Sequence, residues 1–427
     1  MTRSNRLLEY EEYEEYEEDE EKERPQQAGA CSAKASGVRR VLVIFGTRPE
    51  AIKLAPLILH LKSRPAEFQT IVCVTAQHRG MLDQVLGIFR IEPDYDLDLM
   101  LPGQTLFQST SRILAGLETV FDAVNPDLAI VQGDTTTTLC GALAAFYKNV
   151  PVGHVEAGLR SGDVRQPFPE EMNRVLASRI AARHFAATEW AAENLRREGV
   201  PAGSILVTGN TGIDAVLHVR DELECGVLVA PACPVVDSAK KNIVVTAHRR
   251  ESFGAGFDRI CSALARLSQR EDVRIIYPVH PNPNVLTAVN RHLHACPHVQ
   301  LIEPLDYVSF VDLMRRAHIL ITDSGGIQEE GPSLGKPILV LREKTERPEA
   351  VLAGTVRLVG TDEDVIVREA SRLLDDPIAW QAMARSYNPY GDGHASRRIA
   401  DALVKFAAGH PDETAAGLPD EAVAALV

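Results

Sequence analysis

From about residue 41 the chain alternates short apolar runs, rich in β-branched residues, with amphipathic stretches. Segments such as Met81–Phe89 and Gly141–Tyr147 carry apolar residues at helical spacing. The apolar runs between such segments are VLVIF, TIVCVTA, DLAIVQGD, VPVGHVEAG, HFAATE and ILVTGN. Continuous apolar runs of this length are typical of parallel strands that helices cover on both faces. The pattern predicts one α/β domain over residues 38–210.

The alternation stops at Cys225–Lys241, where two prolines indicate a linker or a surface loop. It then restarts with NIVVTAH, VRIIYPVH, VQLIEP, ILITD, PILVL and TVRLVG. The repeated pattern predicts a second doubly wound α/β domain over residues 211–385. We expect a final helix at about Ala395–Ala407, within a segment 386–408, and a flexible tail over 409–427.

The N-terminal 37 residues have a different composition. Glu9–Glu23 reads EYEEYEEYEEDEEKE, which concentrates like charge and has almost no aliphatic side chains. Ordering such a segment costs chain entropy with little burial in return, so we expect a disordered acidic extension over residues 1–37. The start of the chain also lacks the basic flank and the apolar stretch of a signal peptide, which favours a cytoplasmic location.

Charge and cysteine content narrow the function classes. The net charge is −14 over 427 residues, and residues 1–24 hold 4 basic and 11 acidic side chains, so half of the net charge lies in the extension. The rest of the chain does not have the charge of a nucleic-acid-binding surface. The seven cysteines form no C-x-x-C pair, which indicates reduced thiols and no structural zinc site. No apolar run is long enough to predict membrane insertion.

Ionisable residues follow the apolar runs. In an open α/β sheet ligands bind beyond the carboxyl ends of the strands, so these positions are candidates for a binding site. Turn formation explains the glycines and the asparagine there, but it does not explain so many charged groups. The positions are Gly46-Thr47-Arg48, Gln77-His78-Arg79, Gly133-Asp134, Glu156, Asn210, His248-Arg249-Arg250, His280 and Asp323-Ser324-Gly325-Gly326.

The first of these turns, FGTRPEAIK, has neither the G-x-G-x-x-G of a dinucleotide fold nor the G-K-[ST] of a P-loop. NAD, FAD and P-loop ATP binding therefore lose support. Arg48 stands at an expected first helical position and Lys53 about one turn later. Both cations could reach an anion at the N-terminus of that helix, although Lys53 taken alone reads as a solvated helix lysine.

Three carboxylates stand out in the first domain. Asp134 follows a strand and could simply cap the next helix, Glu156 ends the run VPVGHVE, and Glu170 opens an expected helix. A structural role explains each one singly. Gathered in one cleft, they would form an acid/base set whose pKa values mutual repulsion spreads apart.

The second domain contains a candidate phosphate site. In DSGGIQEE two glycines join a strand to a helix, so the backbone N–H groups of Ser324 to Gly326 could approach phosphate oxygens. The acids Glu329 and Glu330 suit a ribose diol better than a phosphate. The cationic triplet His248-Arg249-Arg250 follows another strand. Together these residues predict a nucleoside diphosphate held between the domains.

Between about Val41 and Phe406 the chain contains, in this order, the motifs GTRPEAIKLAP, TAQHRGMLDQVL, QGDTTTT, PVGHVEAGLR, PEEMNR, TGNTGIDA, TAHRRESFG, YPVHPNPNV, TDSGGIQEEGPSLGKP, TERPEA and NPYGDG. This ordered set resembles the non-hydrolysing bacterial UDP-N-acetylglucosamine 2-epimerases. This resemblance implies a GT-B fold of two Rossmann-like doubly wound domains facing a central cleft, with the C-terminal helical segment crossing back to the first domain. It also implies a homodimer that converts UDP-GlcNAc to UDP-ManNAc for cell-surface polysaccharide synthesis without metal or nicotinamide.

The same resemblance implies roles for individual residues. Asp134, Glu156 and Glu170 would be the acid/base carboxylates, and His248 would stabilise the leaving diphosphate. The substrate would be bound by Arg48, Lys53, Phe310 near uracil, Ser324, Gly325, Gly326, Glu330 at the ribose and Arg347. Gln77, Arg249 and His280 match positions at which some members bind a second, activating UDP-GlcNAc.

The implied mechanism is elimination of UDP to a 2-acetamidoglucal, followed by re-addition. Breaking the anomeric C–O bond makes inversion easier, because the C2 hydrogen of a sugar is far from acidic. Three alternatives remain open at this point. They are a hydrolysing UDP-GlcNAc 2-epimerase, a GT-B glycosyltransferase and a non-catalytic UDP-sugar sensor.

Overall fold

A computed structural model describes most of the chain between residues 37 and 407. The described residues are 37–75, 79–101, 103–231, 233, 236–237, 239–345, 347–385 and 387–407. The predictions of an acidic disordered extension, of a flexible tail and of a role for Gln77 fall outside them, apart from Gly37. Among the described helices, none is both long enough and apolar enough to cross a membrane.

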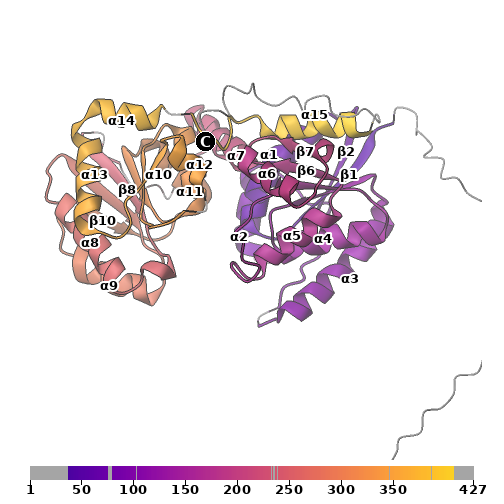
Figure 1. Ribbon diagram of the computed structural model, residues 1–427, viewed down its shortest axis with the longest axis horizontal. Helices are drawn as coiled ribbons and strands as arrows, with labels where there is room; N and C mark the ends of the chain where they lie inside the picture. Colours follow the sequence, from indigo (N-terminus) through magenta and orange to yellow (C-terminus); the bar gives the residue numbers. More distant parts are fainter. Residues whose placement is uncertain are drawn as a thin grey trace, which may run out of the picture. The chain divides into compact units, whose positions relative to one another are not determined.

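The first half of the described chain forms a parallel sheet of seven strands in the order β3-β2-β1-β4-β5-β6-β7. Figure 1 shows helices on both sides of this sheet. The strands are β1 Arg39–Phe45, β2 Phe68–Val74, β3 Tyr95–Asp96, β4 Leu128–Gln132, β5 Val152–Ala157, β6 Arg183–Ala186 and β7 Ile205–Val207. The helices are α1 Arg48–Lys62, α2 Arg79–Ile88, α3 Leu106–Val124, α4 Thr136–Tyr147, α5 Glu170–Ile180, α6 Glu189–Arg197 and α7 Thr211–Glu224.

The second half forms a six-stranded parallel sheet in the order β10-β9-β8-β11-β12-β13. Its strands are β8 Lys241–Thr246, β9 Val273–Pro278, β10 Val299–Ile302, β11 Ile319–Thr322, β12 Ile338–Val340 and β13 Val356–Leu358. The helices are α8 Ala255–Leu267, α9 Pro283–Leu293, α10 Tyr307–Arg316, α11 Gly325–Glu330, α12 Pro348–Leu352, α13 Glu363–Asp375, α14 Pro377–Ala384 and α15 Ala395–Ala407. The prediction of two doubly wound parallel sheets is confirmed.

The core explains why the strands read as continuous apolar runs. Successive residues of β1 point to opposite faces: Val41 and Val43 pack into one buried cluster with α1, and Leu42 and Ile44 pack into another with α3 and α4. Each of these four side chains is fully buried. A strand with helices on both faces has no solvent-facing side, so polar alternation is absent from its sequence.

Each sheet has a switch point, where the strand order reverses. In the first sheet it lies between β1 and β4, and in the second between β8 and β11. Ligands of doubly wound folds bind in the crevice at such a point, outside the carboxyl ends of the strands. The turns after these four strands carry Arg48, Asp134, His248 and Ser324. The topology therefore places the predicted site residues where such a fold binds its ligand.

The local sequence explains how these helices begin. Thr47 caps α1 and forms a capping box with Glu50, and Pro49 stands in the first turn. Helix α4 is capped by Thr135, so Asp134 does not serve as the helix cap that its position allowed. Its carboxylate is free for another role.

The last helix packs back on the first half. Helix α15 contacts α1 and α7, and Arg39 donates a hydrogen bond of 2.8 Å to the carbonyl of Leu403. The helix occupies the predicted range. The boundaries between the domains at 210/211 and 385/386 stay predictions.

Candidate active site

Glu156 sits in a strained turn at the end of β5. The pairing of β5 with β6 shifts between Val155 and Ala157, and Glu156 between them has φ = 60°. A non-glycine residue in the left-handed region is uncommon, and such strain concentrates at functional sites. The irregular turn separates the Glu156 side chain from the regular alternation of the strand.

Lys53 pairs with this carboxylate. Its Nζ lies 2.6 Å from both Oε1 and Oε2 of Glu156, and the Gln132 side-chain amide also donates to Oε2. Burial raises the pKa of Glu156, the charge of Lys53 opposes that rise, and the charges of Glu329 and Asp134 add to it. Burial acts to lower the pKa of Lys53, but the charges of Glu156 and Glu329 outweigh it and raise the pKa. The pair is therefore a buried carboxyl group whose pKa is raised overall and whose rise the charge of Lys53 limits.

Asp134 lies in the turn after β4. Its Oδ2 accepts a hydrogen bond of 2.6 Å from Nη2 of the buried Arg174, and its carbonyl accepts one of 2.9 Å from Asn173. The charge of Asp134 raises the pKa of Glu156, so the two carboxylates interact. Two of the three predicted acid/base groups thus share one electrostatic site.

Glu170 is the first residue of α5 and is partly exposed. Its side chain forms no hydrogen bond or ion pair with another described residue. The adjacent Glu171 is buried instead and accepts hydrogen bonds from the backbone of Ser161 and Gly162. Glu170 shares its helix with the residues that contact Asp134, and its catalytic role stays a prediction.

The second half supplies a buried charge pair. Nε of Arg347 lies 2.5 Å from Oε1 of Glu329, and Oε2 of Glu329 accepts a 2.8 Å hydrogen bond from Asn210. The guanidinium lies over Gly325, where an added Cβ would come within 2.6 Å of it. Gly325 thus has a packing reason to lack a side chain. Residues from the turn before α7, from α11 and from the start of α12 meet in this network.

The predicted ribose residue, Glu330, interacts with this network. Burial and the charge of Glu329 raise the pKa of Glu330 to about 8, and the charge of Lys53 opposes that rise. Ser324 precedes α11, where Gly325 is buried and Gly326 exposed. Phe310 comes from α10 and is half-buried against the main core cluster. Their contacts with a nucleotide stay predictions.

His248 stands on a tightly held turn after β8. The buried Asp323 accepts backbone hydrogen bonds from His248 at 2.6 Å and from Arg249 at 2.7 Å. The rings of His248 and His280 stack with centroids 5.2 Å apart. Burial lowers the pKa of His248, the nearby Asp323 raises it, and His280 and Arg249 lower it further. The side chain remains 41% exposed, so a ligand can reach it.

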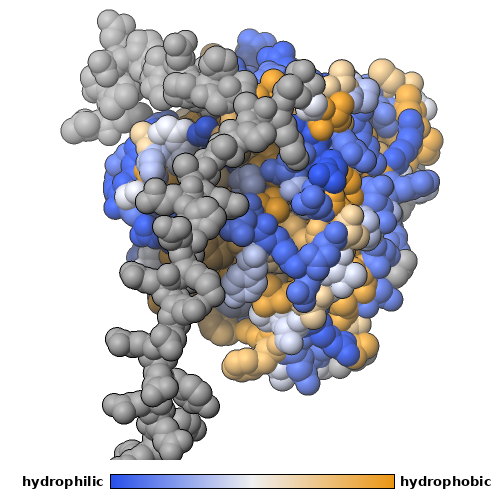
Figure 2. Space-filling model, turned by 90° about the vertical axis from the view of Figure 1, so that its right-hand side faces the viewer, coloured by the Kyte–Doolittle hydropathy of each residue, from blue (hydrophilic) through white to orange (hydrophobic). Residues whose placement is uncertain are grey.

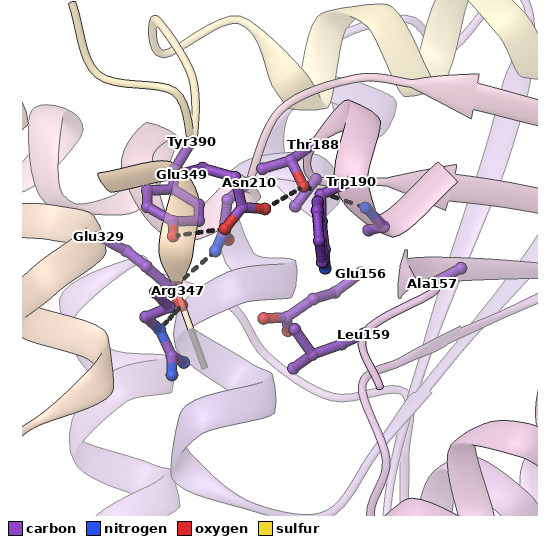
Figure 3. Close-up of a pocket in the computed structure, with 12 residues that line it drawn as sticks. Glu156, Ala157, Leu159, Thr188, Trp190, Asn210, Glu329, Arg347, Glu349 and Tyr390 are labelled. Atoms are coloured by element: carbon purple, nitrogen blue, oxygen red, sulfur yellow. Dashed lines mark hydrogen bonds and ion pairs between the residues drawn. The ribbon is translucent and has the colours of Figure 1, made fainter. Parts of the chain in front are cut away.

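A small pocket is lined by residues of both halves. Figure 3 shows Glu156, Leu159 and Trp190 facing the Glu329–Arg347 pair. Glu349 also lines it and accepts hydrogen bonds from Thr188 at 2.8 Å and from Tyr390 at 3.3 Å.

Arg48 lies at the start of α1 and is exposed.

Sequence reasoning missed several of these residues. Thr188 lies in the run HFAATE, two residues after the end of β6, so the strand-end rule could have found it, and Tyr390 lies in the motif NPYGDG. Arg174 and Glu349 also lie in quoted motifs, PEEMNR and TERPEA, but a charged residue within a helix reads as solvated. Glu50, buried and bonded through Oε1 to Thr135 at 2.7 Å, reads as a helix-start acid.

The arrangement can perform acid/base chemistry beside an anion. It brings together ionisable carboxylates of unlike surroundings, one of which is paired with a lysine, and cations that follow neighbouring strands. Among the described residues, no group of three or more His, Cys, Asp or Glu is placed to hold a metal ion.

Comparisons with known proteins agree with this chemistry. The family model described as UDP-N-acetylglucosamine 2-epimerase matches residues 60–404. The chain is 56% identical over 369 residues to the UDP-N-acetylglucosamine 2-epimerase of Escherichia coli K12, covering 85% of this chain and 98% of the relative. It is 51% identical over 369 residues to that of Bacillus subtilis 168, covering 86% of this chain and 95% of the relative.

A solved structure extends the likeness to the fold. The UDP-GlcNAc 2-epimerase from Neisseria meningitidis, determined bound to UDP-GlcNAc, superposes with a TM-score of 0.78 at 46% identity. The match covers 86% of this chain and all of the other. The two parallel-sheet domains have a GT-B-like fold. The chain belongs to the UDP-N-acetylglucosamine 2-epimerase family.

Proposed function

We propose that the protein catalyses the reversible epimerisation of UDP-GlcNAc to UDP-ManNAc at C2. The observation that carries this proposal is the ion pair between Lys53 and Glu156, with Asp134 near enough to perturb the same carboxylate. Family membership supplies the substrate, and the paired carboxylates supply acid/base groups for inversion at a carbon centre. That the enzyme returns UDP to the sugar and does not hydrolyse the substrate is inferred from the ordered motifs that resemble those of the non-hydrolysing epimerases.

The reaction needs two stages. The bond between C1 and the diphosphate oxygen breaks, a carboxylate removes the C2 proton, and the electron pair of that C–H bond forms the C1–C2 double bond of a 2-acetamidoglucal. A second carboxylic acid then returns a proton to the other face of C2, and UDP adds back at C1. Because charge grows on the leaving diphosphate, fixed cations beside it lower the barrier.

The family resemblance, supported by the contacts of Glu156 and Asp134, favours the following division of roles. Glu156, Asp134 and Glu170 handle protons. The diphosphate is faced by the side chains of His248, Lys53, Arg48 and Arg347. Its oxygens would accept hydrogen bonds from the backbone of Ser324, Gly325 and Gly326. Glu330 would bind the ribose, and Phe310 would pack near uracil. A carboxyl with a pKa of about 8 is largely protonated at neutral pH, so Glu330 can donate as well as accept a hydrogen bond with a hydroxyl.

A second UDP-GlcNAc site is part of the proposal. The ring of His280 stacks on that of His248. The backbone N–H groups of His248 and Arg249 both donate to the carboxylate of Asp323. An anion bound by Arg249 and His280 would therefore act on the turn that carries His248. Titrating the substrate should give sigmoidal rates, and His280→Ala should make them hyperbolic.

We also propose that the protein works as a cytoplasmic homodimer. The six described cysteines are free thiols, as in a reducing compartment. Helices α3, α4 and α5 pack together and expose large apolar side chains, and Figure 2 shows apolar residues among hydrophilic ones in the lower half of that side of the molecule. The exposed residues are Leu106, Phe107, Phe146, Tyr147, Met172 and Leu176. Such exposure is typical of an interaction surface.

Light scattering tests the dimer. Phe107→Asp, at a side chain that is 90% exposed, should convert a dimer to a monomer. Ile378→Asp, at an apolar residue on α14 that is 80% exposed, should leave the dimer intact. A monomeric wild-type protein would contradict the homodimer without affecting the reaction assigned.

An NMR time course with UDP-GlcNAc tests the function. The proposal predicts the UDP-ManNAc spectrum growing to a fixed ratio with no free sugar. UDP with free ManNAc would indicate a hydrolysing epimerase, and consumption only after an acceptor is added would indicate a glycosyltransferase. An unchanged spectrum with measurable binding would indicate a sensor.

A further inference from the structure

Two consecutive side chains of helix α5 form hydrogen bonds with Asp134. Asn173 donates a 2.9 Å hydrogen bond to the Asp134 carbonyl, and Arg174 donates one of 2.6 Å to Oδ2 of its carboxylate. Oδ1 forms no hydrogen bond with a described residue, and the Asp134 side chain is 29% exposed. One carboxylate oxygen is therefore anchored and the other is left for a ligand.

Arg174 is itself held in place. Its side chain is 8% exposed, and its Nη1 lies 3.1 Å from Oε2 of the buried Glu171. Glu171 in turn accepts backbone hydrogen bonds from Ser161 at 3.0 Å and from Gly162 at 3.2 Å. The guanidinium is thus fixed between two carboxylates, a geometry that its planar set of N–H donors suits.

The same turn is anchored from strand β5. Nε2 of His154 lies 2.7 Å from the Gly133 carbonyl, and the Gly133 N–H donates to the Val155 carbonyl at 3.0 Å. Burial lowers the pKa of His154 to about 3, so the ring is neutral and its Nε2–H donates to Gly133. Strand β5 therefore fixes the Asp134 turn through His154, which stands two residues before Glu156 in that strand.

We infer that Arg174 is a positioning residue that acts through Asp134, holding one carboxylate oxygen so that the other meets the reacting sugar. The inference rests on the proposed function, because it requires Asp134 to take part in proton transfer. A positioned group gains most of its advantage from fixed geometry, and small displacements of it are costly to the rate. Loss of Arg174 should therefore lower kcat while substrate binding through the distant nucleotide contacts persists.

A double-mutant cycle tests the inference. Arg174→Gln should lower kcat by about tenfold or more with KM changed by less than about threefold. Asp134→Asn should lower kcat by about a hundredfold or more. The double variant should stay within about threefold of Asp134→Asn alone, because a residue that acts only through Asp134 has no further effect once that carboxylate is gone. Rates are expressed per UDP-binding site, counted by calorimetry, so that a loss of folded protein does not count.

Arg160 provides the matched control. Its side chain is 9% exposed and its Nε lies 2.6 Å from Oε1 of Glu198, but none of its hydrogen bonds reaches Asp134. Arg160→Gln should destabilise the protein comparably and leave kcat per site within about threefold of the wild type. If Arg174→Gln does not fold, Arg174→Lys, which keeps the cation, should show an intermediate kcat and the same lack of additivity.

The outcomes separate this inference from the proposed function. A wild-type kcat in Arg174→Gln, or additive losses in the double variant, would overturn the role of Arg174 alone. A wild-type kcat in Asp134→Asn would instead overturn the acid/base assignment of Asp134 on which it rests.

Discussion

Nζ of Lys53 lies 2.6 Å from both carboxylate oxygens of Glu156, although the two residues are 103 positions apart in the chain. Lys53 comes from the second turn of α1, and Glu156 from the bulged end of β5. Each is the other's nearest opposite charge. The pair couples the ionisation of the candidate base, Glu156, to α1, the helix that begins at the candidate anion site.

Removing Lys53 should shift the pH dependence of the reaction. Burial raises the pKa of Glu156, and Lys53 opposes that rise, so Lys53→Met should raise the pKa further. A base must be ionised, so activity is lost as the pH falls through its pKa. The acid limb of the profile of kcat/KM should therefore move to higher pH. Lys62→Met, at an exposed lysine of the same helix, is the control, and an unmoved acid limb in Lys53→Met would contradict the pairing.

Glu156→Gln should still bind UDP-GlcNAc but lose turnover. The amide keeps the shape of the carboxyl group and cannot take a proton, so we expect kcat to fall by about a hundredfold or more. Calorimetry with UDP should give a Kd within about threefold of the wild type. Wild-type turnover in this variant would remove Glu156 from proton transfer.

His248→Asn should affect the transition state more than the ground state. If His248 supports the departing diphosphate, it interacts most strongly with charge that develops as the C1–O bond breaks. We expect kcat to fall by about tenfold or more while the Kd of UDP changes by less than about threefold. The reverse result, weak UDP binding with normal kcat, would make His248 a simple binding residue.

The two neighbouring glycines of α11 should respond differently to alanine. At Gly325 a Cβ would come within 2.6 Å of the Arg347 guanidinium, but at Gly326 its nearest neighbour would be Oε1 of Glu330 at 3.9 Å. Gly325→Ala should displace Arg347 from Glu329 and weaken UDP binding by about tenfold or more, and Gly326→Ala should weaken it much less. Equal Kd values for the two variants would show that Arg347 does not contact the nucleotide.

Buried His154 should make the fold sensitive to acid. Burial lowers its folded-state pKa from the ordinary 6.5 to about 3. Between pH 6.5 and about pH 3 the unfolded chain binds a proton at His154 that the folded protein does not. The contribution of neutral His154 to the free energy of unfolding is therefore present above pH 6.5 and is lost as the pH falls toward about 3. His154→Gln, which keeps a donor for the Gly133 carbonyl, should lose about 2 kcal/mol less stability than the wild type between pH 7 and about pH 4.5. Parallel losses in urea unfolding would contradict this.

The fold was predictable because its signals are local. The apolar runs that became β1, β4, β5, β8 and β11 contain both faces of a buried strand, and Thr47 with Glu50 marks the start of α1. The final helix falls on its predicted residues for the same reason. Strand β3, only two residues long, carries no periodicity and was not anticipated.

The site was predictable only in part, because partners far apart in sequence leave no local pattern. Position after a strand identified Asp134 and Glu156 as candidates, and nearness to a helix N-terminus identified Lys53. Neither signal could show that Lys53 would pair with Glu156 or that Arg174 would bind Asp134. In the pair Glu170-Glu171 the sequence favoured the first, and it could not show that the second is buried on Arg174. Burial inside a helix depends on which face the rest of the fold covers.

Deuterium exchange at C2 tests the central claim most directly. The account requires a carboxylate to remove the C2 proton and a carboxylic acid in exchange with solvent to return one. With UDP-GlcNAc in deuterium oxide, it predicts deuterium at C2 of both UDP-GlcNAc and UDP-ManNAc as the reaction approaches equilibrium. UDP-ManNAc formed with the original hydrogen still at C2 would contradict elimination and re-addition.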